Sequence, residues 1–206
     1  TGAPSPVSFK NETLAALTKA GCNMGACHGS PSGKAGFRLS LRAFDPTIDV
    51  LTLRSEFFGR RTNPMDPAES LILKKPLMEI AHGGGRRLYK GDASYNVLYN
   101  WIAEGLKLDP PDTPDLVKIE VSPGERVLHQ EGRQQQLVVM GTYSDGSVRD
   151  VTPLTCFSSS NESVATVDDL GLVTKAGRGE SAILARILDK MSTAYVTFLE
   201  DVEGFA

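Results

Sequence analysis

The sequence predicts two domains of different class, a mainly α-helical domain over residues 1–110 and an all-β sandwich over residues 116–202. Three observations predict this division. Residues 111–115 lie in a stretch rich in proline and aspartate, which has little to bury and is typical of a linker. Apolar residues before this linker recur at helical spacing, and those after it alternate as in strands. The length of 206 residues and the 40% hydrophobic content suit one or two globular cores.

The first domain is expected to be helical at its two ends and rich in loops between them. Asn11 is the predicted cap of the first helix, and Leu14 and Leu17 form its apolar face. Ser94 is the predicted cap of the last helix, in which Trp101 is expected to pack into the core. The expected helices cover residues 11–20, 50–58, 67–73 and 94–106.

The second domain shows strand patterns separated by turn signals. Residues 116–121 alternate strictly between apolar and polar side chains, as in a half-buried strand. Ser144-Asp145-Gly146-Ser147 is a hairpin turn signal. The other expected strands cover residues 136–143, 164–167, 170–174, 182–188 and 193–199. About seven short strands in this length predict a sandwich of immunoglobulin type.

Two cysteines and a histidine give the clearest chemical signal. Cys22 and Cys27 are followed at once by His28, which is the set that covalent haem attachment requires. Each thiol adds to one haem vinyl group, and the adjacent imidazole reaches the iron. The usual motif is C-x-x-C-H, and this spacer is two residues longer. Gly25 and Ala26 are small, so the extra residues are expected to bulge without a clash.

The same residues also permit two other interpretations. Cys22 and Cys27 are suitable partners for a disulfide. A structural zinc site needs four ligands, and the further candidates are Cys156, His82 and His129. The sequence contains no second C-x-x-C pair to complete such a site.

A six-coordinate haem needs a second axial ligand. The loop before the last helix holds His82, which we prefer, and Met78, the usual type of ligand in small cytochromes c. Three glycines follow His82, and a backbone without side chains lies close against a porphyrin. An open distal site is the third possibility.

The charge is distributed unevenly along the chain. Residues 1–112 carry 14 Lys and Arg against 11 Asp and Glu, a charge of +3, whereas residues 113–206 carry 8 against 14, a charge of −6. Four arginines are predicted to pair with haem propionates or to form an exposed basic face for an acidic electron partner: Arg60, Arg61, Arg86 and Arg87. The acidic total and the absence of a basic stripe argue against nucleic-acid binding. No apolar run is long enough to span a membrane.

Both halves resemble known families. The first resembles the planctomycete-type cytochrome c domain found at the N-terminus of large secreted proteins. The motifs that match are residues 21–29, 36–41, 59–61, 70–76, 82–85 and 101–102. The second resembles the bacterial Ig-like domain of group 2, through residues 143–147, 150–152, 158–161, 164–168 and 171–173. The first resemblance implies one c-type haem attached to Cys22 and Cys27, with His28 as the proximal ligand.

These observations predict a periplasmic or otherwise exported monohaem cytochrome c. Its expected function is electron transfer to a redox protein, not catalysis, as the N-terminal part of a larger secreted polypeptide. Two alternatives belong to other classes. One is a haem-based sensor, or a ligand-binding or catalytic haem domain with an open distal site. The other is a binding module without haem, in which Cys22 and Cys27 form a disulfide.

Overall fold

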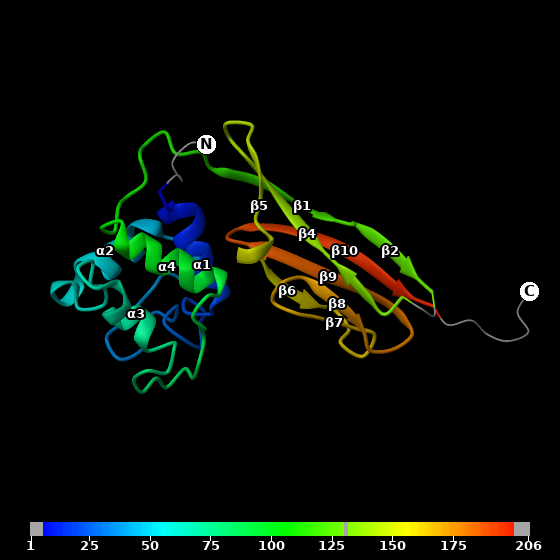
Figure 1. Ribbon diagram of the computed structural model, residues 1–206, viewed down its shortest axis with the longest axis horizontal. Helices are drawn as coiled ribbons and strands as arrows, with labels where there is room; N and C mark the ends of the chain where they lie inside the picture. Colours follow the sequence, from blue (N-terminus) through cyan, green and yellow to red (C-terminus); the bar gives the residue numbers. More distant parts are fainter. Residues whose placement is uncertain (1–5, 130–131, 200–206) are drawn as a thin grey trace, which may run out of the picture. The chain divides into compact units, whose positions relative to one another are not determined.

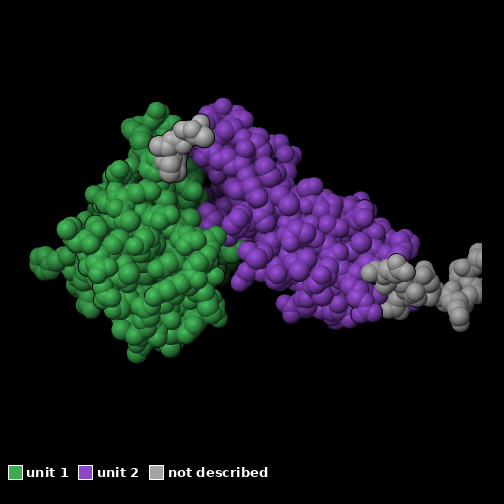
Figure 2. Space-filling model, viewed as in Figure 1, with its two compact units in different colours: residues 1–113 green, residues 114–206 purple. Residues whose placement is uncertain are grey.

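The computed structural model describes residues 6–129 and 132–199 (Figure 1). The chain forms two compact units, residues 1–113 and residues 114–206 (Figure 2). The predicted second domain extends to residue 202, so its last three residues lie outside the described ones. Among the described residues, no helix combines the length and apolar character needed to cross a membrane.

The first unit consists of short helices joined by long loops. Its α-helices are α1 (Leu14–Lys19), α2 (Pro46–Arg54), α3 (Leu71–Lys74) and α4 (Ala93–Ala103). A π-helical turn η1 (Phe9–Thr13) precedes α1, and 3-10 turns are η2 (Leu41–Ala43), η3 (Glu56–Gly59) and η4 (Pro67–Glu69). The helical segments therefore lie near the predicted ones, with bounds that differ by a few residues.

The helix starts differ from the predicted starts because other residues supply the caps. Ser8, not Asn11, caps the first helical segment, since its hydroxyl accepts from the Asn11 amide at 3.1 Å. Asp45 caps α2 by accepting from the backbone amides of Thr47 and Ile48, so this helix begins four residues before the predicted start. The last helix begins at Ala93, and Ser94 is buried inside it.

The core of the first unit lies between its first and last helical segments. Trp101 in α4 is 1% exposed, and its ring lies 5.1 Å from the ring of Phe9. The indole N–H donates to the Lys107 carbonyl at 2.9 Å, so its polar atom is satisfied. Leu14 and Leu17 of α1 are fully buried, as predicted from their spacing. This packing holds the end of α1 in place, and the cysteine segment begins there.

The second unit is an Ig-like β-sandwich. Its strands are β1 (Leu116–Ser122), β2 (Glu125–Leu128), β3 (Gln134–Gln136), β4 (Val138–Tyr143), β5 (Val148–Asp150), β6 (Cys156–Ser159), β7 (Ala165–Val167), β8 (Leu172–Lys175), β9 (Gly179–Ile187) and β10 (Lys190–Phe198). They form three hydrogen-bonded groups with the orders β1-β4-β5, β2-β10-β9-β6 and β3-β8-β7. The longest ladder pairs β9 with β10 antiparallel, and β2 joins β10 in parallel.

Alternating burial explains which strands the sequence predicted. In β9 every second residue from Ser181 to Ile187 is buried, and in β10 the same holds for Ala194, Val196 and Phe198. These side chains form the interior of the sandwich. The strands that the sequence did not predict, β2 and β5, contain no fully buried residue. They therefore lack the alternation by which a strand is detected.

Candidate functional site

The end of helix α1 determines where Cys22 lies. Gly21 has φ +75°, a left-handed conformation that glycine adopts without strain. The Gly21 amide donates to the Thr18 carbonyl, and the Cys22 amide donates to the Leu17 carbonyl at 2.9 Å. These two bonds are those of a Schellman motif, which closes a helix just after a glycine. Cys22 is therefore held, buried, directly after the helix.

The long spacer is a closed loop. The His28 amide donates to the Cys22 carbonyl at 2.9 Å, so the chain returns to its starting point. Gly29, and not the predicted Gly25, is the glycine that this path requires. A Cβ at Gly29 would lie 2.0 Å from the Asn23 carbonyl oxygen, whereas a Cβ at Gly25 has 4.0 Å to its nearest neighbour. The loop brings Cys27 and His28 to the wall that also carries Cys22.

None of the three cysteines forms a disulfide, so the alternative of a Cys22–Cys27 disulfide is not the state of this structure. Burial raises the pKa of the Cys22 thiol to about 12, and the neighbouring Cys27 adds to the rise. Cys22 is thus protonated at neutral pH. Cys156 lies half-buried in β6 of the other unit. No group of three or more His, Cys, Asp or Glu side chains among the described residues is arranged to hold a metal ion, which disfavours the zinc alternative.

The orientation of His28 is fixed by a backbone carbonyl. Its Nδ1 lies 3.0 Å from the Phe37 carbonyl oxygen, and its ring lies 4.4 Å from the Phe37 ring. A carbonyl only accepts, so Nδ1 carries the proton and Nε2 keeps its lone pair. Burial lowers the pKa of His28 below 6.5, and the Phe37 bond opposes this effect. His28 is therefore a neutral imidazole with Nε2 available as a ligand.

His82 is arranged in the same way. Its Nδ1 lies 2.8 Å from the Gly85 carbonyl oxygen, which again leaves Nε2 with its lone pair. The glycines after it make room for the ring, because a Cβ on Gly84 would lie 2.9 Å from the His82 Cε1. The Arg87 Nε donates to the Gly84 carbonyl at 2.9 Å and holds this loop.

The two imidazoles line one pocket. Their ring centroids are 6.4 Å apart, and the ring planes differ by 10°. The pocket has a volume of about 650 Å³, within the range of roughly 300–1,000 Å³ for sites that bind small molecules or cofactors. It is lined by Gly21, Cys22, Cys27, His28, Lys34, Ala35, Gly36, Phe37, Phe57, Arg60, Arg61, Leu71, Ile72, Lys75, Pro76, His82, Gly83, Gly84 and Arg87.

The distance between the imidazoles allows a test of whether haem fits. A bond from imidazole nitrogen to a metal is about 2 Å long, and the nitrogen lies roughly 1 Å from its ring centroid, so two axial imidazoles have centroids about 6 Å apart. The separation of His28 and His82 agrees with this value. Cys22 and Cys27 line the same pocket as His28. The separation of the imidazoles and the types of side chain at the pocket, two thiols and two imidazoles, are those that a covalently attached haem requires.

The other predicted haem contacts divide into two groups. Arg60 and Arg87 line the pocket, together with Lys34 and Lys75, which the sequence did not single out. Cationic groups at the wall suit a ligand with carboxylates. Arg61 also reaches the wall, but it is buried and bonded to protein carbonyls.

Met78 and Arg86 are not among the residues that line the pocket. Met78 is 44% exposed, and Arg86 lies over the Tyr89 ring at 5.3 Å. The carbonyl that accepts from His28 belongs to Phe37. Phe37 lies in the motif of residues 36–41 that carries the resemblance, but nothing in the sequence pattern marks its carbonyl as the acceptor.

A buried carboxylate fixes the segment that follows Phe37. Asp49 in α2 is fully buried and accepts from the Ser40 amide at 2.6 Å and the Ser40 hydroxyl at 2.7 Å. Burial raises the pKa of Asp49, although both Ser40 bonds favour its charged form. The neighbouring Leu39 amide donates to the His28 carbonyl at 2.8 Å. Asp49 thus anchors the strand-like segment against which the histidine is held.

Comparison with known proteins identifies the second unit. Residues 117–185 match the bacterial Ig-like domain (group 2), which confirms the resemblance and the sandwich predicted for this half. Ice-binding protein 1 of Shewanella frigidimarina (strain NCIMB 400) is 40% identical over 70 residues, which are 34% of this chain and 8% of that protein.

Solved structures of the surface-layer protein SbsC are also similar, but distantly. Its domains 4–9 match with 16% identity and a TM-score of 0.38, over 46% of this chain and 16% of that one. Its domains 4 and 5 match with 18% identity and a TM-score of 0.37, over 42% of this chain and 54% of that one. Likenesses of this size carry no argument about function.

These findings correct the predicted function. The chain was expected to be a monohaem cytochrome c that transfers electrons in the periplasm, but the matched proteins are an Ig-like family and an ice-binding protein. The described residues also contain no cluster of three or more metal-binding side chains. The prediction of an electron-transfer cytochrome is therefore wrong. Of the two predicted domains, only the Ig-like domain is confirmed. The family match lies wholly in the second unit, so the pocket of the first has to be interpreted from its own residues.

Proposed function

We propose that the first unit is a ligand-binding unit that holds one haem, within an exported protein of several domains, and that it is not an electron carrier. The observation that carries this proposal is the pair of imidazoles, 6.4 Å apart and nearly parallel, with both Nδ1 atoms bonded to carbonyls. Two imidazoles that line one pocket, each with Nδ1 bonded to a carbonyl, favour a metal bound through their Nε2 atoms.

Cys22 and Cys27 would attach the haem covalently. In each reaction the thiol S–H adds across one vinyl C=C bond: sulfur bonds to one carbon and the hydrogen goes to the other. No oxidant or reductant is consumed. The free state of both thiols and their position on the wall beside His28 support this role. The first-half resemblance to the planctomycete-type cytochrome c domain supports the same attachment.

His28 and His82 would hold the iron of the haem. The ring of His28 is held by the Phe37 carbonyl and the Phe37 ring, in a loop closed by further backbone bonds. His82 is held in a loop of three glycines, whose ordering costs more conformational entropy than that of other residues. Haem supplies an iron that binds small diatomic molecules.

The charges at the pocket suit the haem carboxylates. Lys34, Arg60, Lys75 and Arg87 bring positive groups to the wall. Propionates are carboxylates, and arginine binds carboxylates in a bidentate way. Arg86, which is not on this wall, remains a prediction as a contact.

The Ig-like unit would act as a spacer or attachment module. The group 2 match and the partial match to ice-binding protein 1 support a place in a larger, exported protein. Covalent haem attachment through cysteines takes place outside the cytoplasmic membrane, which supports the same location.

The proposal is tested with the 206-residue chain exported from a bacterial host that attaches haem to cysteines. We expect the intact mass to rise by one haem and the reduced spectrum to change when carbon monoxide is added. His82→Ala should give a high-spin spectrum and faster carbon monoxide binding. Met78→Ala is the matched control and should change neither, because Met78 does not line the pocket.

Two results would contradict the proposal in different ways. A polypeptide without added mass would show that the pocket takes no covalent haem. A loaded protein whose reduced spectrum is unaffected by carbon monoxide would show that haem is bound but that the unit does not bind ligands.

A further inference from the structure

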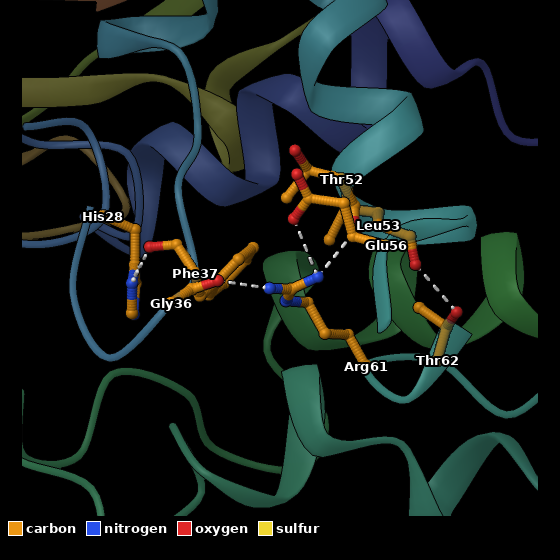
Figure 3. Close-up of polar contacts among 8 residues, drawn as sticks. All are labelled: His28, Gly36, Phe37, Thr52, Leu53, Glu56, Arg61 and Thr62. Atoms are coloured by element: carbon orange, nitrogen blue, oxygen red, sulfur yellow. Dashed lines mark hydrogen bonds and ion pairs between the residues drawn. The ribbon is translucent and has the colours of Figure 1, made fainter. Parts of the chain in front are cut away.

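Arg61 is a buried arginine near His28, and it is not one of the residues proposed to contact the haem carboxylates. Arg61 is 6% exposed, and Figure 3 shows its guanidinium between two segments of the chain. Nη1 donates to the Thr52 carbonyl at 2.9 Å, and Nη2 donates to the Gly36 carbonyl at 2.7 Å. Glu56 forms an ion pair with Nη1 at 3.1 Å. A buried charge is tolerated only when it is bonded in this way.

One side of this arrangement closes helix α2. The Thr52 and Leu53 carbonyls are in the last turn of α2, where the carbonyls have no partner within the helix. Arg61 binds the first, and the Thr62 hydroxyl donates to the second at 3.1 Å (Figure 3). A positive charge at a helix C-terminus is also favoured by the helix dipole. Arg61 is therefore held firmly by α2.

The other side holds the segment that carries the His28 acceptor. Gly36 and Phe37 supply successive carbonyls: Arg61 binds the first at 2.7 Å, and His28 donates to the second, with 3.0 Å between Nδ1 and oxygen. The guanidinium also lies 4.6 Å from the centroid of the Phe37 ring, which in turn contacts the His28 ring. The Gly36–Phe37 segment is thus fixed between the arginine and the histidine.

Phe57, a second aromatic residue beside the Arg61 guanidinium, has an uncommon backbone conformation. The guanidinium lies 5.2 Å from the Phe57 ring, so Phe37 and Phe57 both contact it. Phe57 and the next residue have φ values of +50° and +58°, which non-glycine residues seldom adopt. Such backbone persists only where the surroundings fix it. This supports a role in geometry and not only in net charge.

We propose that Arg61 is a positioning residue, which holds the Gly36–Phe37 segment so that the Phe37 carbonyl keeps His28 in one tautomer and one orientation. This inference rests on the proposed function, because a fixed Nε2 matters only if His28 binds the haem iron. The hydrogen bonds that fix His28 are formed by protein atoms and do not require haem. Its test can therefore be made without haem, and a failure of one proposal is distinguished from a failure of the other.

The experiment measures the tautomer of His28 by ¹⁵N NMR of the imidazole nitrogens in the ligand-free 206-residue chain at pH 8. Wild type should show the Nδ1–H form. Arg61→Gln should lower the ratio of the Nδ1–H to the Nε2–H form by about fivefold, which corresponds to one net hydrogen bond. Arg60→Gln is the matched control, because Arg60 is the exposed neighbour on the same pocket, and its ratio should stay as in wild type.

Arg61→Lys separates geometry from charge. Lysine keeps the positive charge but lacks the planar fork that reaches two carbonyls at once. We expect it to lower the ratio as well, and it serves as the second variant if Arg61→Gln does not fold. A folded variant, with the circular dichroism of wild type and an unchanged ratio of tautomers, would overturn the proposal.

Discussion

The two units of this chain reach their structures by different means. In the second unit, alternating apolar residues in β9 and β10 build the interior, and the ladder between these strands sets the register. In the first unit, the residues that define the pocket lie mostly in loops, and single hydrogen bonds to carbonyls orient them. A periodic pattern thus specifies a core, whereas a site depends on contacts that have no period.

The largest effect is expected for the core of the second unit. Phe198 in β10 is 0% exposed, and Phe198→Ala should lower the free energy of unfolding by about 3–5 kcal/mol, from lost burial and the cavity left behind. Leu199, the next residue, is 38% exposed, and Leu199→Ala should cost under about 1 kcal/mol. Urea denaturation followed by circular dichroism measures both. Equal costs would show that alternation does not define this core.

A smaller effect is expected in the cysteine loop of the first unit. A Cβ at Gly29 would lie 2.0 Å from the Asn23 carbonyl oxygen, so Gly29→Ala should destabilise the protein by about 2–3 kcal/mol. Gly25→Ala in the same loop meets only Leu41 at 4.0 Å and should change stability by less than about 0.5 kcal/mol. The same urea experiment compares the pair. The reverse order would mean that the spacer bulges at Gly25, as the sequence alone had indicated.

This pair shows where prediction from sequence ended. The strand pattern of the second unit and the buried faces of the first and last helices of the first unit were predictable, because each depends on neighbours in the same element. The residues of the motif, Cys22, Cys27 and His28, were found from their spacing. That Gly29 is the required glycine depends on a carbonyl from across the loop, and that Phe37 is the acceptor of His28 depends on a turn nine residues away.

The second histidine illustrates the same limit. The sequence offers both His82 and Met78 in the loop before the last helix, and only the folded loop brings one of them, His82, to the pocket. The role of Arg61 was also beyond the sequence, because an arginine beside a pocket is expected to face a ligand. Its partners are two carbonyls from segments on either side of it, and no local pattern records them.

The glycines after His82 allow a finer comparison within the first unit. A Cβ on Gly84 would lie 2.9 Å from the His82 Cε1 and 3.2 Å from Nε2, so Gly84→Ala should displace this imidazole. Gly83→Ala meets nothing within 4 Å and is the control. In the haem-loaded protein we expect Gly84→Ala to increase the high-spin fraction of the absorption spectrum, at a cost of about 1–2 kcal/mol in the His82 contact. Identical spectra for the two variants would contradict the placement of His82.

The smallest effect is a dependence of stability on pH that arises from His28. Burial lowers its pKa in the folded, ligand-free protein below the value of 6.5, so between these two values the unfolded chain binds more protons than the folded one. The contribution of His28 to the free energy of unfolding is fully present above pH 6.5. It is lost as the pH falls from 6.5 through the pKa of His28 in the folded protein. Asp49 acts with the opposite sign, because burial raises its pKa above 3.8, so between these two values the folded state binds more protons than the unfolded chain.

The contribution of His28 is isolated by comparing wild type with His28→Gln. Both chains keep Asp49, so the difference between their unfolding free energies, measured in urea between pH 7.5 and pH 5, reports the histidine alone. As pH falls, we expect wild type to lose stability relative to the variant. The loss should be well under the cost of a core substitution, because His28 is only half-buried. A difference that does not vary with pH would mean that the imidazole is as free to take up a proton in the folded loop as in the unfolded chain.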